Sequence, residues 1–220
     1  MLKDIIRSFL PWILFFILLN HSQEQIDIAV IIAGVTSVIF DFRGLKKRFI
    51  LNWGTFAFFI FLFVAVVLFK NQWVAKQAWL FSNGTLAAIA WISILLRQPF
   101  TIQYAKLQVA KDKWNHPLFL KINYILTAVW GSIFLFNLMI HVLRIYYHTV
   151  NGWIYESITY GTPIFGIWFM AWFPNWYRKK ILVQAHEKYS RLSFFKDYHQ
   201  VKKKSKICLQ LMTYSAKYGW

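Results

Sequence analysis

Histidine and carboxylate side chains are the groups of this chain that could bind a metal ion or move a proton. They fall near one end of the apolar stretches, at His21, Glu24, Asp27, His141, His148 and Glu156. Imidazole with carboxylate is good ligand chemistry for a divalent metal. On one unbroken helix, however, His141 and His148 would be about 10 Å apart along the axis and could not share an ion. We therefore predict that these residues are hydrated, with no metal centre and no cofactor.

Polar side chains within the apolar stretches could instead line a path for ions or protons. The candidates are Asn52, Asn83, Asn123, Asn137 and Glu156. A carboxylate inside a membrane is costly enough to be a functional candidate by default. Glu156 lies only three residues inside its stretch, where it can reach water. The asparagines can also form structural hydrogen bonds between helices, and both interpretations stay open.

Soluble-enzyme motifs are missing from the sequence. It has no Gly-x-Ser-x-Gly, no phosphate-binding glycine loop, no Cys-x-x-Cys and no His-Glu-x-x-His. Cys208 is the only cysteine, so an intramolecular disulfide is excluded. These features leave catalysis uncertain and favour a non-enzymatic protein.

Six apolar stretches must position these residues. They are Ile5–Leu19, Ile26–Phe40, Phe49–Phe69, Ala78–Leu96, Ile122–Val142 and Trp153–Phe173. The chain is 58% hydrophobic and only 15% charged, which leaves too little polar surface for a protein of this length in water. In lipid each backbone polar group needs a partner inside its own segment or in a closed barrel. Because the stretches lack the alternation of barrel strands, we predict helices. The first two are short for a full span, which needs about 20 residues.

Lysine and arginine are distributed unevenly among the connections between these stretches. The N-terminal end and the second, fourth and last connecting segments carry 22 of the 25 basic residues. Basic segments stay on the cytoplasmic side of a membrane. The fold class predicted is all-α, with six transmembrane helices and both termini in the cytoplasm, in a bacterial inner membrane. Residues 1–175 would form the membrane domain and residues 176–220 a basic amphipathic tail.

Two basic segments on the predicted cytoplasmic side are candidate functional surfaces. The connection 97–121 is too long for a simple turn, and a short surface helix is expected between Pro99 and Pro117. In the tail, basic residues with helical spacing predict a helix lying in the membrane interface. The residues expected to bind anionic lipid are Lys179, Lys180, Lys202, Lys203, Lys204 and Lys206. Such lysines contribute about 1 kcal/mol each near anionic headgroups, so the net charge of +17 requires no nucleic acid as partner.

Two further residue types predict where the helices meet lipid and each other. Tryptophans near the ends of the stretches, including Trp12, Trp53 and Trp79, are expected in the headgroup layer. Gly84 and its neighbours Ala87 and Ala88 are small enough to allow close helix packing.

Two phrases of the sequence resemble the bacterial intracellular septation protein A family. They are FLPWILFF at Phe9–Phe16 and WNHPLFLKINYILTAVWGSIFLFN at Trp114–Asn137. The resemblance covers residues 5–142, and the polybasic tail departs from it. It implies a small polytopic inner-membrane protein linked to envelope integrity and division, and it carries over no catalytic residues.

Three functions are compatible with these patterns. The leading hypothesis is a non-enzymatic, envelope-associated membrane protein that organises partners or anionic lipids through basic cytoplasmic surfaces. Its partner would be a membrane protein or a second copy of the chain. The first alternative is a small transporter or channel with a polar path between the fourth and fifth helices. The second is a lipid-modifying enzyme that uses the histidines and acids of the outer face.

Overall fold

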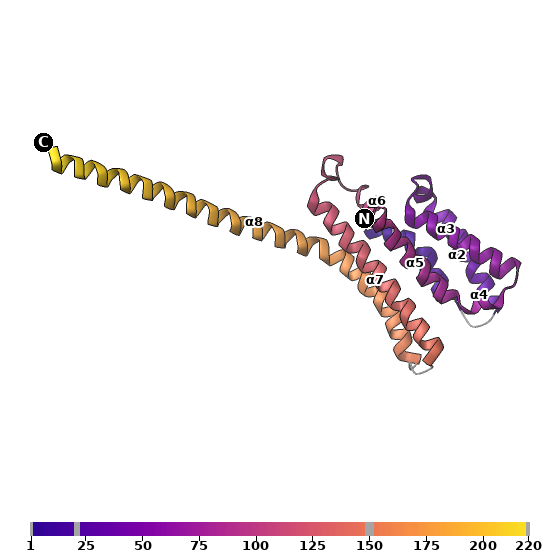
Figure 1. Cartoon of the computed structure of the whole chain (residues 1–220). Helices are drawn as coiled ribbons and strands as arrows, with labels where there is room; N and C mark the ends of the chain where they lie inside the picture. The colour runs from indigo at the N-terminus through magenta and orange to yellow at the C-terminus, as the bar shows by residue number, and fades with distance from the viewer. Residues whose placement is uncertain (1, 20–22, 148–151, 219–220) are drawn as a thin grey trace. The chain divides into compact units, whose positions relative to one another are not determined.

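The computed structural model describes residues 2–19, 23–147 and 152–218, and the regular elements in these ranges are all helices. The chain forms two compact units, Met1–Trp172 and Phe173–Trp220. The elements, shown in Figure 1, are α1 (Leu2–Leu18), α2 (Gln23–Lys46), α3 (Ile50–Leu62), the π-helix η1 (Phe63–Leu68), α4 (Gln72–Lys76), α5 (Ala78–Leu95), α6 (Phe100–Ala105), the 3₁₀-helix η2 (Lys111–Lys113), α7 (Pro117–Tyr147) and α8 (Gly152–Tyr218).

The predicted all-helical fold is confirmed, because all six apolar stretches are helical apart from end residues. Three helices are long and apolar enough to cross a membrane: Ile50–Leu68, Ala78–Leu95 and Pro117–Tyr146. The apolar part of α2, Gln25–Phe40, is shorter. These helices indicate association with a membrane. The number of six spans and the side of each terminus remain predictions.

In the first unit, antiparallel neighbours pack along much of their length. Helix α5 lies against α7, α2 lies against both α1 and α3, and the 152–172 part of α8 runs beside α7 (Figure 1). Stacked aromatic rings fill the core between them. The Phe9 ring of α1 stacks on Trp130 of α7 with centroids 4.9 Å apart. Such a pair contributes about 0.5–1.5 kcal/mol beyond the burial of its surface.

Trp12 occupies the core rather than the headgroup layer expected for it. Its side chain is 1% exposed and stacks on Phe58 with ring centroids 4.8 Å apart. The indole Nε1 donates a hydrogen bond to the Thr55 hydroxyl at 2.8 Å. A buried indole needs such a partner, and α3 supplies one. Trp53, by contrast, is 50% exposed, and its place in the headgroup layer remains a prediction.

Close packing of α5 on α7 uses a different glycine from the one expected. Gly84 has open space where a Cβ would lie, so the prediction that it allows close approach is wrong. At Gly131 of α7, an added Cβ would lie 2.8 Å from the Trp91 Nε1 atom and 3.2 Å from Ala90 Cβ. The α5–α7 contact therefore depends on Gly131.

Helices α2 and α5 end in the same way, each at an arginine with left-handed backbone. Arg48 and Arg97 both have φ of 56°. In each case the arginine N–H bonds the carbonyl three residues back, and the next N–H bonds the carbonyl five residues back, at 2.9–3.0 Å. This is a Schellman motif, which normally has glycine at the left-handed position because other residues there cost about 1–2 kcal/mol.

The second unit is the helical continuation of α8 from Phe173. Phe173 stacks on Tyr177 with centroids 5.3 Å apart, and the Lys180 ammonium lies 5.1 Å from the centre of the Trp176 ring. The helix predicted in the tail is thus present as backbone. Its amphipathic placement in the interface, and the predicted domain boundary after residue 175, remain predictions.

Alanine substitutions at the two glycines should have opposite effects on stability. Gly131→Ala is expected to destabilise the protein by about 1–3 kcal/mol, because its methyl group overpacks the α5–α7 contact. Gly84→Ala is the matched control and should stabilise by about 0.5–1 kcal/mol, since it adds helix propensity without a clash. Reversible unfolding in detergent micelles measures the free energy of unfolding of both variants. Equal effects would contradict the conclusion that Gly131, and not Gly84, allows the close packing of α5 on α7.

Candidate functional site

The connection 97–121 contains a short helix that is buried, not exposed. A short helix is present between Pro99 and Pro117 as predicted, but the prediction that it lies on the surface is wrong. Five of its six residues are buried, including Phe100 and Tyr104. Local apolar residues are enough to predict the helix, but they do not show that the connection folds back between α3, α5 and α7.

Tyr104 and Asn52 form the centre of a buried hydrogen-bond network. The Tyr104 hydroxyl donates to the Asn52 Oδ1 atom at 2.7 Å, and the Asn52 Nδ2 atom donates to the Ser8 hydroxyl at 3.1 Å. Tyr104 and Asn52 are 2% and 1% exposed. The Phe49 ring meets the Tyr104 ring edge-on, with centroids 4.9 Å apart. This network joins α6, α3 and α1.

A second set of bonds fixes the other side of α6. The Thr101 hydroxyl donates to the Asn123 carbonyl of α7 at 2.9 Å and lies 2.8 Å from the Thr127 hydroxyl. The Phe100 N–H donates to the Ser93 hydroxyl of α5 at 3.1 Å. All these groups are buried, and each unmade bond would cost about 1–3 kcal/mol. Helix α6 is therefore a fixed bridge between α3, α5 and α7.

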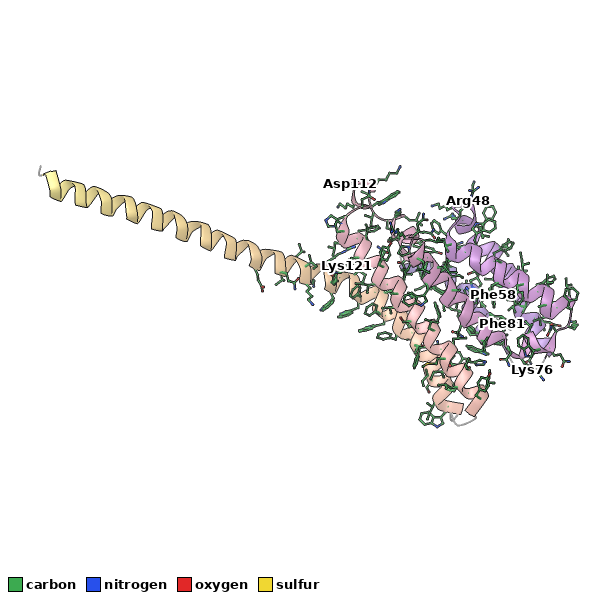
Figure 2. All side chains as sticks on the ribbon, in the orientation of Figure 1. Arg48, Phe58, Lys76, Phe81, Asp112 and Lys121 are labelled. Carbon is green, nitrogen blue, oxygen red and sulfur yellow. The ribbon has the colours of Figure 1, made fainter. Side chains whose placement is uncertain are left out.

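The bridge brings three basic segments to one end of the first unit. The Gln103 side chain accepts a hydrogen bond from the Ile50 N–H at 2.8 Å, and Gln108 donates to the Asp4 carboxylate at 2.9 Å. Figure 2 shows Arg48 and Asp112 at this end and Lys76 at the opposite end. We name this the basic end, and define it by its exposed cations Lys3, Arg43, Lys46, Lys47, Arg48, Arg97, Lys111 and Lys113.

The opposite end of the unit contains a cavity of about 490 Å³ with polar and apolar walls. We name it the distal cavity. Its lining residues are Leu19, Ile26, Ala75, Lys76, Gln77, Trp79, His141, Arg144, Ile145, Tyr155, Glu156, Thr159 and Tyr160. The His141 Nδ1 atom lies 2.8 Å from the Tyr155 hydroxyl. The Arg144 guanidinium lies over the same ring, 4.1 Å from its centre.

The distal cavity brings together two of the residues predicted from sequence. His141 and Glu156 both line it, whereas His21 and His148 lie outside the described residues. No group of three or more potential metal ligands is present in the part of the chain that the structure describes. The absence of a metal site stays a prediction.

The four asparagines proposed for a polar path have separate partners. The Asn83 amide donates to the Trp79 carbonyl at 3.0 Å and the Asn123 amide to the Phe119 carbonyl at 2.8 Å, each within its own helix. Asn137 accepts a hydrogen bond from the Thr162 hydroxyl of α8 at 2.9 Å. Asn52 belongs to the Tyr104 network. These bonds leave one amide atom, Asn123 Oδ1, buried without a hydrogen-bond partner among the described residues. The path itself remains a prediction.

The predicted lipid-binding lysines all lie on α8. Lys179 and Lys180 are exposed, while Lys202, Lys203, Lys204 and Lys206 are described as helical backbone only. Ser8, Thr101 and Tyr104 are not identified from the sequence. Ser8 carries the same signal as the asparagines, a polar residue within an apolar stretch, whereas Thr101 and Tyr104 lie in the 97–121 connection, where polar residues are ordinary.

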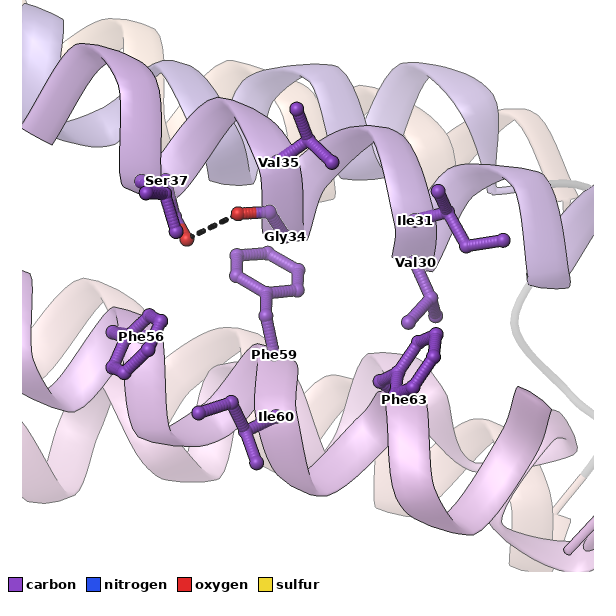
Figure 3. A pocket seen from close by; sticks show the side chains of 10 residues that line it. Val30, Ile31, Gly34, Val35, Ser37, Phe56, Phe59, Ile60 and Phe63 are labelled. Atoms are coloured by element: carbon purple, nitrogen blue, oxygen red, sulfur yellow. Dashed lines mark hydrogen bonds between the residues drawn. The ribbon is translucent and has the colours of Figure 1, made fainter. Parts of the chain in front are cut away.

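An apolar groove lies between α2 and α3. It has a volume of about 250 Å³ and is lined by aliphatic and phenylalanine side chains, among them Val30 and Phe59 (Figure 3). The Ser37 hydroxyl at its edge donates to the Gly34 carbonyl of its own helix at 2.7 Å. With that hydroxyl bonded, the groove offers apolar contact alone.

Comparisons of the chain with models of protein families, with curated proteins and with solved structures find no match. The basic end and the distal cavity are therefore the features that bear on the function of this protein.

Removing the Tyr104 hydroxyl should loosen the basic end. Tyr104→Phe leaves the buried Asn52 Oδ1 atom without this donor, which is expected to cost about 1–3 kcal/mol. Tyr146→Phe, at an exposed tyrosine, is the matched control and should change stability by less than about 0.5 kcal/mol. Unfolding in detergent micelles gives both values, and a neutral Tyr104→Phe would contradict the role of the network.

Proposed function

We propose that this chain is a multi-pass protein of a bacterial inner membrane that organises anionic lipids and membrane partners through basic cytoplasmic surfaces. In this proposal six helices cross the membrane and both termini lie in the cytoplasm. The protein acts by binding and not by catalysis.

The gathering of basic segments at one end of the first unit is the observation that carries the proposal. The start of α1, the α2–α3 turn and the 97–121 connection are separate in sequence, yet hydrogen bonds from Gln103 and Gln108 bring them together. Basic loops are retained in the cytoplasm. Anionic headgroups of that leaflet attract nearby lysine and arginine by about 1 kcal/mol each. A rigid cluster of exposed cations is suited to this attraction.

The tail and the family resemblance support the same function. The second unit continues as a helix through the run Lys202-Lys203-Lys204-Ser205-Lys206, which holds four lysines within about 6 Å along the helix axis. The resemblance to the septation protein A family supports a role in the cell envelope. The transporter alternative receives less support, because the four asparagines have separate hydrogen-bond partners.

Cysteine labelling tests the topology. In a Cys208→Ser background, Lys47→Cys and Ser205→Cys should react with a membrane-impermeant maleimide only when the cytoplasmic side is accessible, since basic loops stay inside. Gln72→Cys should react from the outside. Lys47 and Gln72 are both exposed. Labelling of Lys47→Cys and Ser205→Cys from opposite sides would refute six spans with both ends inside.

Neutralising the polybasic run tests lipid binding. Replacing Lys202, Lys203, Lys204 and Lys206 by Gln should reduce the preference for spin-labelled anionic lipid over phosphatidylcholine by at least about fivefold in reconstituted vesicles. Replacing the same four residues by Arg keeps the charge and should keep the preference. High salt should weaken the wild-type preference. An unchanged preference in the Gln variant would remove the support for this function.

A further inference from the structure

The distal cavity lies at the depth of lipid headgroups if α7 crosses the membrane. Helix α7 has 31 residues, so it is about 46 Å long. The hydrocarbon core is about 30 Å thick, which leaves about 8 Å, or roughly five residues, outside it at each end. Arg144 lies three residues from the last residue of α7, Tyr147. Its guanidinium is thus placed where phosphate groups of the bilayer lie.

One wall of the distal cavity carries groups that bind phosphate. Arg144 and Lys76 supply two cations, and both line the cavity. When the Tyr155 hydroxyl donates to His141 Nδ1, the proton of the neutral ring lies on Nε2. In the described part of the chain this Nε2 atom is buried without a hydrogen-bond partner. The His141 Nε2–H group could therefore donate a hydrogen bond to a phosphate oxygen.

The same cavity also carries acceptors for a cation. Glu156 lines it with an exposed carboxylate. The Gln77 Oε1 atom is buried and has no hydrogen-bond partner among the described residues. A primary ammonium has three N–H donors and could bond both oxygens. A purely anionic ligand would leave Gln77 Oε1 unpaired and would place a negative charge near Glu156.

Apolar side chains complete the walls of the distal cavity. Leu19, Ile26 and Ile145 are aliphatic, and Trp79 and Tyr160 meet edge-on with ring centroids 6.1 Å apart. Amphipathic rings of this kind favour the boundary between hydrocarbon and headgroups. A ligand with acyl chains could place them on this wall.

We propose that the distal cavity binds the headgroup of a zwitterionic phospholipid, a phosphodiester next to a primary ammonium. The phosphate is bound by Arg144, Lys76 and the His141 Nε2–H, and the ammonium by Glu156 and Gln77. The volume of about 490 Å³ is within the usual range of small-molecule sites, about 300–1,000 Å³. Within the first unit this site is at the opposite end from the basic end. It rests on the proposed function in one respect, the crossing of the membrane by α7, but its contacts can fail without affecting lipid binding by the basic end or the tail.

Native mass spectrometry of the purified full chain in maltoside detergent can measure this binding. The ligands are phosphatidylethanolamine, phosphatidylcholine, phosphatidylglycerol and chain-free glycerophosphoethanolamine. Phosphatidylethanolamine should bind about tenfold more tightly than phosphatidylcholine, whose trimethylated nitrogen has no N–H donor, because a charge-assisted hydrogen bond is lost. It should also bind more tightly than the chain-free headgroup. At the distal cavity, measured as the binding that is lost in Arg144→Gln, it should bind more tightly than phosphatidylglycerol.

Variants assign the two halves of the headgroup. Arg144→Gln should weaken all three phospholipids about tenfold, and Arg144→Lys should weaken them less because it keeps the charge. Glu156→Gln should weaken phosphatidylethanolamine and leave phosphatidylglycerol unchanged or stronger. Tyr146→Phe, at an exposed tyrosine that belongs neither to the distal cavity nor to the basic end, is the control and should leave the binding of all three phospholipids unchanged.

Several results would overturn the proposal. Unchanged phosphatidylethanolamine binding in Glu156→Gln, or in both Arg144 variants, would exclude the assigned contacts. Equal affinity for the chain-free headgroup would point to a soluble phosphoamine in place of a lipid. If the binding lost in Arg144→Gln is tighter for phosphatidylglycerol than for phosphatidylethanolamine, a zwitterionic ligand is excluded. Thermal unfolding identifies any variant that has lost its fold. If Arg144→Gln has lost it, the binding measured in Glu156→Gln and Arg144→Lys decides whether the assigned contacts are correct.

Discussion

Hydrogen bonds between buried side chains at the basic end determine how the helices of the first unit are arranged. The Tyr104–Asn52 bond joins residues 52 positions apart, and Thr101 reaches Asn123 from the other face of the same short helix. In lipid the hydrophobic effect does not drive one apolar helix against another, so polar links and close packing must select the arrangement. Helix α6 supplies the links, and Gly131 allows the close packing. The grouping of the basic segments follows from both.

Much of the fold could be predicted from the sequence because it depends on local composition. Long apolar stretches without alternation can satisfy their backbone groups only as helices. Helices α1, α2, α3 with η1, α5, α7 and α8 cover the six predicted stretches apart from end residues. Features that depend on contacts between distant segments could not be predicted in this way. Trp12 has the residue type of the headgroup layer, but Thr55 and Phe58 make a better environment for it. Gly84 and Gly131 look alike in sequence, and only the facing side chains distinguish them.

The candidate sites show the same limit. His141 and Glu156 could be named as candidate site residues from the sequence, because ionisable residues near a membrane span are unusual. Lys76, Gln77 and Tyr155 could not be grouped with them, since the distal cavity is lined from α2, α4, α5, α7 and α8, from the residue after α1 and from the residue between α4 and α5. Arg144 carried one signal, because it is the only basic residue between the fifth and sixth apolar stretches. From the sequence a single arginine is expected to be solvated, and only the structure shows that Arg144 lines a cavity.

The arginines that close α2 and α5 would have two roles in the proposed topology. At both positions the residue that ends the helix would also be one of the charges that hold its loop on the cytoplasmic side. Glycine would relieve the left-handed backbone but would discard the charge, so stability and orientation place opposite demands on these two sites. Arginine at both positions therefore keeps the loop charges and leaves about 1–2 kcal/mol of backbone strain at each helix end.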